Sequence, residues 1–353
     1  MSTDLGRKPR AVALISGGLD SLLATKLVMD QGVHVEGLNF FTGFCVEGHT
    51  HAIRESKAKS QPRNNALWVA EQLGIKLHII DVIDDYKDVV LNPTHGYGKN
   101  LNPCLGCKVF MVNRAETWGF MQDGGFDFVI TGEVMGQRPK SQQKDKLALI
   151  ARESGVEDRL LRPLSAQHLP ATLPEREGWI DRAAMRGFHG RNRKPQIALA
   201  QEMGFKDWAQ PAGGCCFLTD PEYSNRLQDM WDARDERRYD LDDIMLLKVG
   251  RHLRPAANFK LLIGREEGEN NYLEGYRKRF IHLRTPGHKG PLALLDGNPT
   301  AADLALAGRI LARYSQGKAE ANVEVSVHKL DGVVEQLTVQ PMAPQDIPRA
   351  WHV

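Results

Sequence analysis

The chain has 353 residues, of which 42% are hydrophobic and 25% are charged, as is ordinary for a soluble globular protein of one or two domains. No apolar run approaches the roughly 20 residues that a membrane-spanning helix needs, and residues 1–10 lack the apolar core of a signal peptide. We therefore expect a cytoplasmic protein without a membrane partner. The formal net charge of +2 is too small to indicate a nucleic-acid partner by itself.

Apolar segments with β-strand character alternate with helix-patterned stretches in the first half of the chain. Strands are expected at residues 11–15, 33–40, 77–82 and 126–131, and helices at residues 22–31 and 65–73. This alternation predicts an α/β fold, a doubly wound parallel sheet with helices on both faces. Since ligands of such sheets bind at the carboxyl ends of the strands, the loops after Ile15, Phe41 and Thr131 should line one cleft.

The first of these loops, residues 16–21, reads Ser-Gly-Gly-Leu-Asp-Ser. Its adjacent glycines allow the backbone to approach an anion, and the hydroxyls of Ser16 and Ser21 add hydrogen-bond donors. The unpaired N–H groups at the start of the next helix face the same point. Because the loop has neither the Gly-Lys-Ser/Thr ending of a Walker P-loop nor three spaced glycines, it indicates another class of nucleotide site.

Placed directly after the first strand, this motif resembles the PP-loop of the N-type ATP pyrophosphatases, enzymes that split ATP between its α and β phosphates. The resemblance implies a Rossmann-like catalytic domain that binds ATP and Mg²⁺, with Asp20 aligning and neutralising the phosphates. The residues that it assigns to the nucleotide are Ser16, Gly17, Gly18, Asp20 and Ser21.

Four of the five cysteines fall in two tight groups, Cys104 with Cys107 and Cys215 with Cys216. Such clustering favours a metal or redox site, and a reducing compartment disfavours a disulfide framework. We expect Cys104 and Cys107 to flank a two-residue turn that aims both sulfurs at one centre. One thiolate of the second group would complete a three-cysteine site, which leaves one iron of a four-iron cluster open. The lone Cys45 is interpreted as a structural thiol.

A PP-loop together with Asn-Pro-Cys-x-x-Cys and a later cysteine resembles the tRNA thiolation enzymes. Residues 132–142 and 211–220 are similar to segments of a bacterial thiouridylase or 4-thiouridine synthase-like branch, and the resemblance covers residues 10–235. It implies a [4Fe-4S] cluster held by Cys104, Cys107 and Cys216, with Cys215 as the alternative third ligand. A four-cysteine Zn²⁺ site and metal-free persulfide chemistry stay open.

The implied activity is that of a tRNA sulfurtransferase. A carbonyl oxygen of a nucleobase leaves poorly until ATP converts it to an ester of AMP, after which a sulfur species can displace it. The sulfur donor would be inorganic sulfide or a cysteine desulfurase system, and a homodimer is compatible with the chain. An amidating ligase with structural zinc and a non-catalytic RNA-binding protein are the alternatives.

Several charged residues are candidate contacts for ATP or RNA. Arg138 and Lys140 can bind phosphate or remain solvated, and Glu133 is either a catalytic or a structural carboxylate. The basic segment 186–194 is the best candidate for an RNA backbone contact. The polar, basic insertion 49–63 fits a solvated loop as well as an RNA contact.

A charged helical stretch at residues 220–243 separates the catalytic domain, expected at residues 1–235, from a second unit at residues 246–353. Strands are expected at residues 247–254, 259–264, 279–283, 292–295, 323–328 and 333–339, and a helix at 301–314. The pattern predicts a smaller α+β domain. Gly250-Arg251-His252, followed by Ile263-Gly264-Arg265 and residues 269–271, is similar to the NFACT-R type domain, which implies RNA binding. An architectural or dimerising module is the alternative.

Overall fold

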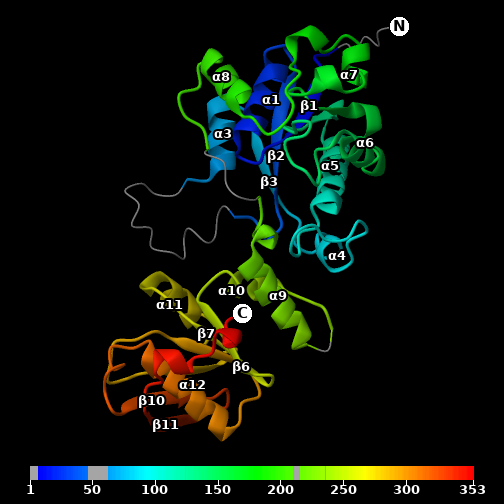
Figure 1. The fold of residues 1–353 in the computed structure, drawn as a ribbon. Helices are drawn as coiled ribbons and strands as arrows, with labels where there is room; N and C mark the ends of the chain where they lie inside the picture. Colours follow the sequence, from blue (N-terminus) through cyan, green and yellow to red (C-terminus); the bar gives the residue numbers. More distant parts are fainter. Residues whose placement is uncertain (1–6, 47–62, 124, 210–214, 235) are drawn as a thin grey trace. The chain divides into compact units, whose positions relative to one another are not determined.

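The structure, a computed structural model, describes residues 7–46, 63–123, 125–209, 215–234 and 236–353 (Figure 1). These residues divide into two compact units. The first runs to Cys45 and continues from Arg63 to Cys215, and the second contains Cys216 to Val353. Of the basic insertion expected at residues 49–63, only Arg63 lies within the described residues.

The first unit is built on a parallel sheet in the order β3-β2-β1-β4-β5. Its strands are β1 (Arg10–Leu14), β2 (His34–Phe41), β3 (Leu77–Asp81), β4 (Phe128–Ile130) and β5 (Leu160–Leu161). The predicted α/β class and the four predicted strands are confirmed. Because the chain leaves β1 toward β2 on one side while β4 pairs on the other, the gap between the ends of β1 and β4 is a topological switch point, where such sheets bind ligands.

Helices of the first unit pack around this sheet (Figure 1). They are α1 (Leu19–Met29), α3 (Asn65–Leu73), α4 (Lys87–Leu91), α5 (Cys104–Met121), α6 (Lys144–Glu153), α7 (Leu173–Arg176) and α8 (Lys194–Glu202), with 3-10 turns η1 (Glu157–Arg159), η2 (Ala166–His168) and η3 (Arg182–Ala184). The expectation that Cys104 and Cys107 flank a turn is wrong, because both lie in the first turn of α5. Pro103 precedes them as the N-cap of α5, where a residue without an N–H group is tolerated because the helix would leave that N–H unpaired.

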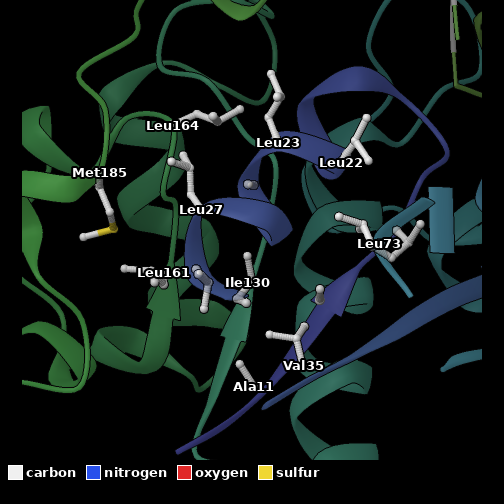
Figure 2. Packing of buried hydrophobic residues seen from close by; sticks show 14 of the residues in the cluster. Ala11, Leu22, Leu23, Leu27, Val35, Leu73, Ile130, Leu161, Leu164 and Met185 are labelled. Carbon is white, nitrogen blue, oxygen red and sulfur yellow. The ribbon is translucent and has the colours of Figure 1, made fainter. Parts of the chain in front are cut away.

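A single apolar cluster fixes α1 against the sheet. Figure 2 shows Leu27 of α1 packed with Ile130 of β4 and Leu161 of β5, and all three are buried. Since α1 is buried along most of its length, the loop that joins β1 to α1 is held at the switch point by two rigid elements.

The second unit has an antiparallel sheet in the order β11-β10-β8-β9-β7-β6. Its elements are η4 (Phe217–Thr219), α9 (Pro221–Asp232), α10 (Leu241–Leu246), β6 (Arg251–Ala256), β7 (Phe259–Ile263), α11 (Glu267–Glu274), β8 (Ile281–Arg284), β9 (Ala293–Gly297), α12 (Ala301–Arg313), β10 (Val323–His328), β11 (Val334–Val339), η5 (Pro344–Asp346) and η6 (Arg349–Trp351). The predicted α+β class is confirmed. One face of the sheet packs on α12, and part of the other packs on α10 and α11.

Helix α9 belongs to this second unit. The Tyr223 hydroxyl donates to the Ile244 carbonyl at 3.0 Å, and Arg226 donates to the Leu247 carbonyl at 3.0 Å. The second unit therefore begins before residue 246, where the change of composition placed its start.

None of the helices that the structure describes combines the length and apolar character that a bilayer crossing requires.

Candidate active site

The loop between β1 and α1 presents backbone donors at the switch point. Gly18 caps α1 in an extended conformation, and no side-chain cap reaches the first N–H groups of this helix within the described part of the chain. The Ser21 hydroxyl donates to the Gly18 carbonyl at 2.8 Å, and Ser16 and Ser21 lie 3.5 Å apart through their Oγ atoms. A helix start with open N–H groups and two hydroxyls is a site for a phosphate.

Gly17 is required by the shape of this loop. Its φ of +78° lies in the left-handed region, and a Cβ added there would lie 2.7 Å from the Asn65 Cβ and 2.8 Å from the Ala66 nitrogen. A side chain is therefore excluded by both conformation and space. The start of α3 packs directly on the phosphate loop.

The loop after β4 packs just as closely on the other side. A Cβ added at Gly132 would lie 2.6 Å from the backbone carbon and oxygen of Asp20 and from the Ser21 nitrogen. The loops after Ile15 and Thr131 thus lie against each other at one edge of the sheet, and the cleft expected between them stays a prediction.

Replacing Gly132 by alanine should push the phosphate loop out of place, because the contacting atoms are backbone and cannot rotate away. We expect a stability loss of about 1–3 kcal/mol and weakened ATP binding. Denaturant unfolding and titration with ATP measure the two effects. The matched control is Gly106→Ala, where the nearest contact is an ordinary 3.8 Å to Val89 and neither property should fall; equal behaviour of the two variants would contradict the close packing of the two loops.

Asp20 is held by residues from two distant segments. Gln137 donates its side-chain amide to Asp20 Oδ2 at 2.8 Å, and Arg193 Nη2 lies 3.5 Å from Oδ1. The side-chain amide of Gln196 in turn donates to the side-chain oxygen Oε1 of Gln137 at 3.1 Å. Asp20 Oδ1 is buried and has no hydrogen-bond partner among the described residues. Oδ1 thus has an ion pair with Arg193 but accepts no hydrogen bond, so a cation such as Mg²⁺ would have to displace Arg193 to bind it.

Glu133 is a buried carboxylate beside this loop. Arg162 donates to its Oε2 at 2.9 Å and Thr131 donates to the same oxygen at 3.2 Å. Burial by itself would raise the pKa of Glu133, but the charges of Arg162 and Lys108 and these hydrogen bonds outweigh it and hold the pKa below 4.5. The Glu133 carboxylate is therefore ionised at neutral pH, and its main partner is the buried guanidinium of Arg162.

The first turn of α5 lies at the same edge of the sheet as the phosphate loop. Gly119, in the last turn of α5, packs against Val12 and Phe126, so the helix runs antiparallel to the strands and starts at their carboxyl ends. Lys108, next to Cys107, is close enough to help lower the pKa of Glu133. The first cysteine group and the phosphate loop therefore share one edge.

The two thiols of α5 differ in their ionisation. Burial, reinforced by Cys215, raises the pKa of Cys107 to about 12 despite a hydrogen bond with Tyr86. Burial and Cys215 also raise the pKa of Cys104, but Arg138 and Lys108 oppose the shift. The Cys104 thiol donates to the Asn102 side-chain oxygen at 3.0 Å. Cys215 thus interacts with both thiols of α5 and, being exposed, is accessible to a partner.

Cys216, the first choice for a third ligand, belongs to the second unit instead. Its carbonyl accepts hydrogen bonds from the backbone N–H and hydroxyl of Thr219, and it influences the pKa of Tyr223. Within the described part of the chain, no three His, Cys, Asp or Glu side chains gather closely enough to hold a metal ion. The expected [4Fe-4S] cluster or Zn²⁺ site therefore stays a prediction.

The remaining predicted residues lie around the same edge. Arg138 and Lys140 are exposed, and the Gly190 N–H donates to the Met135 carbonyl at 2.7 Å. The basic segment 186–194 thereby runs beside residues 134–142. Cys45 is half-buried, with its sulfur 3.7 Å from the Thr42 hydroxyl.

Sequence reasoning missed the residues that hold the site together. Gln137 and Arg193 both lie in segments that the sequence singles out, yet nothing in their spacing indicates that they meet at Asp20. Arg162 follows β5, a strand too short to show a pattern. A glycine at position 132, just after a predicted strand, was the one sequence signal that another backbone segment packs closely there.

Residues 9–160 match the family model described as tRNA methyl transferase HUP domain, and residues 250–352 match the one described as NFACT protein RNA binding domain. The PP-loop and NFACT-R resemblances inferred from the sequence are thus confirmed over these residues.

Similar curated proteins include tRNA-specific 2-thiouridylases. MnmA of Sulfurimonas denitrificans is 34% identical over 34% of this chain and 33% of its own length, and MnmA of Marinobacter nauticus is 27% identical over 62% and 53%. The chain thus spans about a third to a half of the length of these relatives. A solved 4-thiouridine synthetase in complex with RNA and ATP overlaps 68% of this chain and 50% of its own, at 20% identity and a TM-score of 0.40. Because this TM-score is low, the fold assignment of the first unit depends on its own strand order and not on this likeness.

Proposed function

We propose that this protein is an ATP-dependent tRNA sulfurtransferase, which adenylates a nucleobase carbonyl oxygen and replaces it with sulfur. One observation carries the proposal. The segment 134–142 connects the two halves of the chemistry, because Gln137 donates to Asp20 of the phosphate loop and the charge of Arg138 acts on the Cys104 thiol. The 2-thiouridylase relatives and the RNA-binding family model support the same activity. With tRNA as the substrate, we expect the protein in the cytoplasm.

In the first step the phosphate loop binds the pyrophosphate part of ATP. The carbonyl oxygen of the base attacks the α-phosphorus, a new O–P bond forms, and pyrophosphate leaves with the electrons of the broken bond. Mg²⁺, when bound, neutralises the phosphate charge, and Asp20 is the residue that fits it. The open N–H groups at the start of α1 stabilise the departing pyrophosphate.

In the second step thiols deliver the sulfur. A persulfide on a donor protein, such as a cysteine desulfurase system, passes its outer sulfur to the exposed Cys215. The terminal sulfur of this Cys215 persulfide attacks the activated ring carbon, a C–S bond forms, and AMP leaves with the former carbonyl oxygen. Cys104 then attacks the Cys215 sulfur, which frees the thiolated base and leaves a Cys104–Cys215 disulfide. A dithiol reductant returns two electrons and two protons before the next turnover.

The ionisation of the thiols supports these roles. A pKa of about 12 keeps Cys107 protonated at neutral pH, so it is a poor nucleophile. Burial and Cys215 also raise the pKa of Cys104, but Arg138 and Lys108 oppose the shift, and the positive end of α5 favours a thiolate at its first residue. These opposing charges favour Cys104 over Cys107 as the nucleophile.

Cysteine variants test the proposal in a reaction that contains tRNA, ATP, Mg²⁺ and a desulfurase system, with nucleoside mass spectrometry as the readout. Cys104→Ser and Cys215→Ser should each lower thiolation to below about 1% of the wild-type rate, whereas the control Cys45→Ser should stay active. Loss of activity in Cys216→Ser, with Cys215→Ser active, would move the sulfur chemistry to the other cysteine. Anaerobically purified protein with iron and sulfide near about four per chain would restore the cluster, and an amidated product formed from ammonium would favour the ligase alternative.

A further inference from the structure

A cavity of about 300 Å³ lies wholly within the second unit, a size at the lower end for small-molecule sites. Residues of α9, α10 and the strands β6, β7 and β9 line it. Its lining residues, from Met230 to Asn298, include none of the phosphate loop and none of the cysteines, and the chemistry proposed above makes no use of it.

The cavity exists because the apolar face of the sheet ends partway along its strands. Leu262 of β7 pairs with Leu294 of β9, and both are buried in the cluster that α10 covers. Lys260 and Asp296 form the next pair on the same face of the sheet, because each lies two residues from a member of the leucine pair along its strand. The apolar pair forms the floor, and the charged pair lies at the wall.

The lining has three cations, Arg234, Arg254 and Lys260, and Arg254 and Lys260 share the carboxylate of Asp229. With Asp243 and Asp296 the carboxylates beside these cations equal them in number. Arg234 makes a two-pronged ion pair with Asp243 at 2.7 and 2.9 Å, and Lys260 donates to Asp229 at 2.8 Å. Burial lowers the pKa of Lys260 and Asp229 opposes that shift. A wall of compensated charges favours a neutral polar ligand over a phosphate.

His252 supplies an unsatisfied acceptor in the lining. Its side chain is 3% exposed, and Nε2 lies 2.8 Å from the Val249 carbonyl, so Nε2 carries the proton and Nδ1 the lone pair. Nδ1 is buried without a hydrogen-bond partner among the described residues. Leaving such an acceptor unpaired is costly, and the buried Nδ1 makes His252 a polar but uncharged part of the lining.

The wall itself displays a donor next to an acceptor. Lys260 has N–H donors beyond its bond to Asp229, and the exposed Asp296 carboxylate on the paired position can accept two hydrogen bonds from a ligand. Guanine carries the complementary edge, a carbonyl oxygen next to two N–H donors. Adenine and cytosine offer a donor on one exocyclic amine only, and uracil offers one N–H between two acceptors. The Phe280 ring adds an aromatic wall for a flat ligand.

We propose that this cavity binds a guanine base, with Asp296 and Lys260 forming hydrogen bonds to its edge and Phe280 packing on its ring. The proposed function supplies the source, an unpaired guanosine of the tRNA substrate, since single-stranded RNA is recognised through such splayed bases. A free guanine nucleotide shares the chemistry and is the other source.

The test uses the full chain with its ATP site saturated by α,β-methylene-ATP. Titration with GMP, AMP, CMP and UMP in a calorimeter should show GMP binding at least about tenfold more tightly than the others. Asp296→Asn should weaken GMP binding about tenfold, and Phe280→Leu at least about fivefold. The control Glu324→Gln changes an exposed carboxylate of β10 outside the cavity and should have no effect.

The RNA arm measures tRNA affinity of the same variants. A fall in Asp296→Asn and Phe280→Leu, but not in Glu324→Gln, supports the RNA source; GMP binding lost with tRNA affinity unchanged would overturn it in favour of the free nucleotide. No saturable preference for GMP in the wild type would overturn the guanine assignment. Thiolation is measured on the wild type in parallel. GMP binding without thiolation would contradict the proposed function and still support the assignment of guanine to the cavity.

Discussion

Replacing Asp20 by asparagine should slow the release of pyrophosphate from ATP by at least about a hundredfold, with tRNA affinity unchanged. The substitution keeps the shape of the side chain and removes the charge that Gln137 and Arg193 hold in place and that fits Mg²⁺. Steady-state pyrophosphate release in the presence of tRNA and equilibrium tRNA binding measure the two quantities. In the proposed function the carboxylate contacts the phosphates and not the RNA, so only pyrophosphate release should fall.

The matched control is Asp30→Asn at the other end of α1. Asp30 is exposed and pairs with Lys26 on the same helix, so its charge contributes to stability only weakly. Pyrophosphate release should be unchanged in this variant. A parallel loss of catalysis and tRNA affinity in Asp20→Asn would mean that Asp20 organises the whole surface rather than the phosphates.

The phosphate loop can be predicted from the sequence because its requirements are local. Gly17 needs a left-handed conformation, Ser21 bonds three residues back to Gly18, and both flanking elements carry their own apolar patterns. The helix at residues 301–314 is predictable for a similar reason, since Thr300 and Asp303 form a capping box at its start. Local chemistry of this kind needs no knowledge of the fold.

The partners of the loop could not be predicted in the same way. Gln137 and Arg193 reach Asp20 only because the segments after β4 and before α8 converge at the switch point, and Gln196 of α8 then bonds to the Gln137 side chain. Their side chains fit solvated loops equally well when only the sequence is known. Long-range contacts between polar residues leave no periodic signal.

The cysteines show where local reasoning fails. Three buried residues of α5, Val112, Ala115 and Gly119, have helical spacing, but the Asn-Pro-Cys-x-x-Cys pattern suggested a turn at its start. Cys215 and Cys216 are adjacent, yet they belong to different compact units. No composition change marks a boundary between two neighbouring cysteines, so the sequence alone could not select the one that interacts with Cys104.

Replacing Arg162 by methionine should destabilise the first unit by about 3–5 kcal/mol at pH 7, because it leaves Glu133 as a buried, unpaired charge. In the wild type the pKa of Glu133 is lowered from 4.5. The ionised Glu133 therefore adds to the free energy of unfolding above pH 4.5, and this stabilisation is lost as the pH falls through the folded-state pKa. Without Arg162, burial dominates and raises the pKa of Glu133, so the variant gains a proton at higher pH. The stability difference between the two proteins should therefore shrink on acidification.

Hydrogen exchange of the β1 and β4 amides at pH 7 and pH 5 measures this difference in the first unit alone. The double variant with Glu133→Gln should recover part of the loss, since it removes the stranded charge and keeps the side-chain volume. Arg159→Met is the matched control: its pair with Glu116 is more exposed, so its loss should cost about 1 kcal/mol or less. If Arg162→Met proved no more costly than Arg159→Met, or its cost stayed constant with pH, then Glu133 would not be the buried charge that Arg162 compensates, and its unpaired oxygen beside the phosphate loop would need another role.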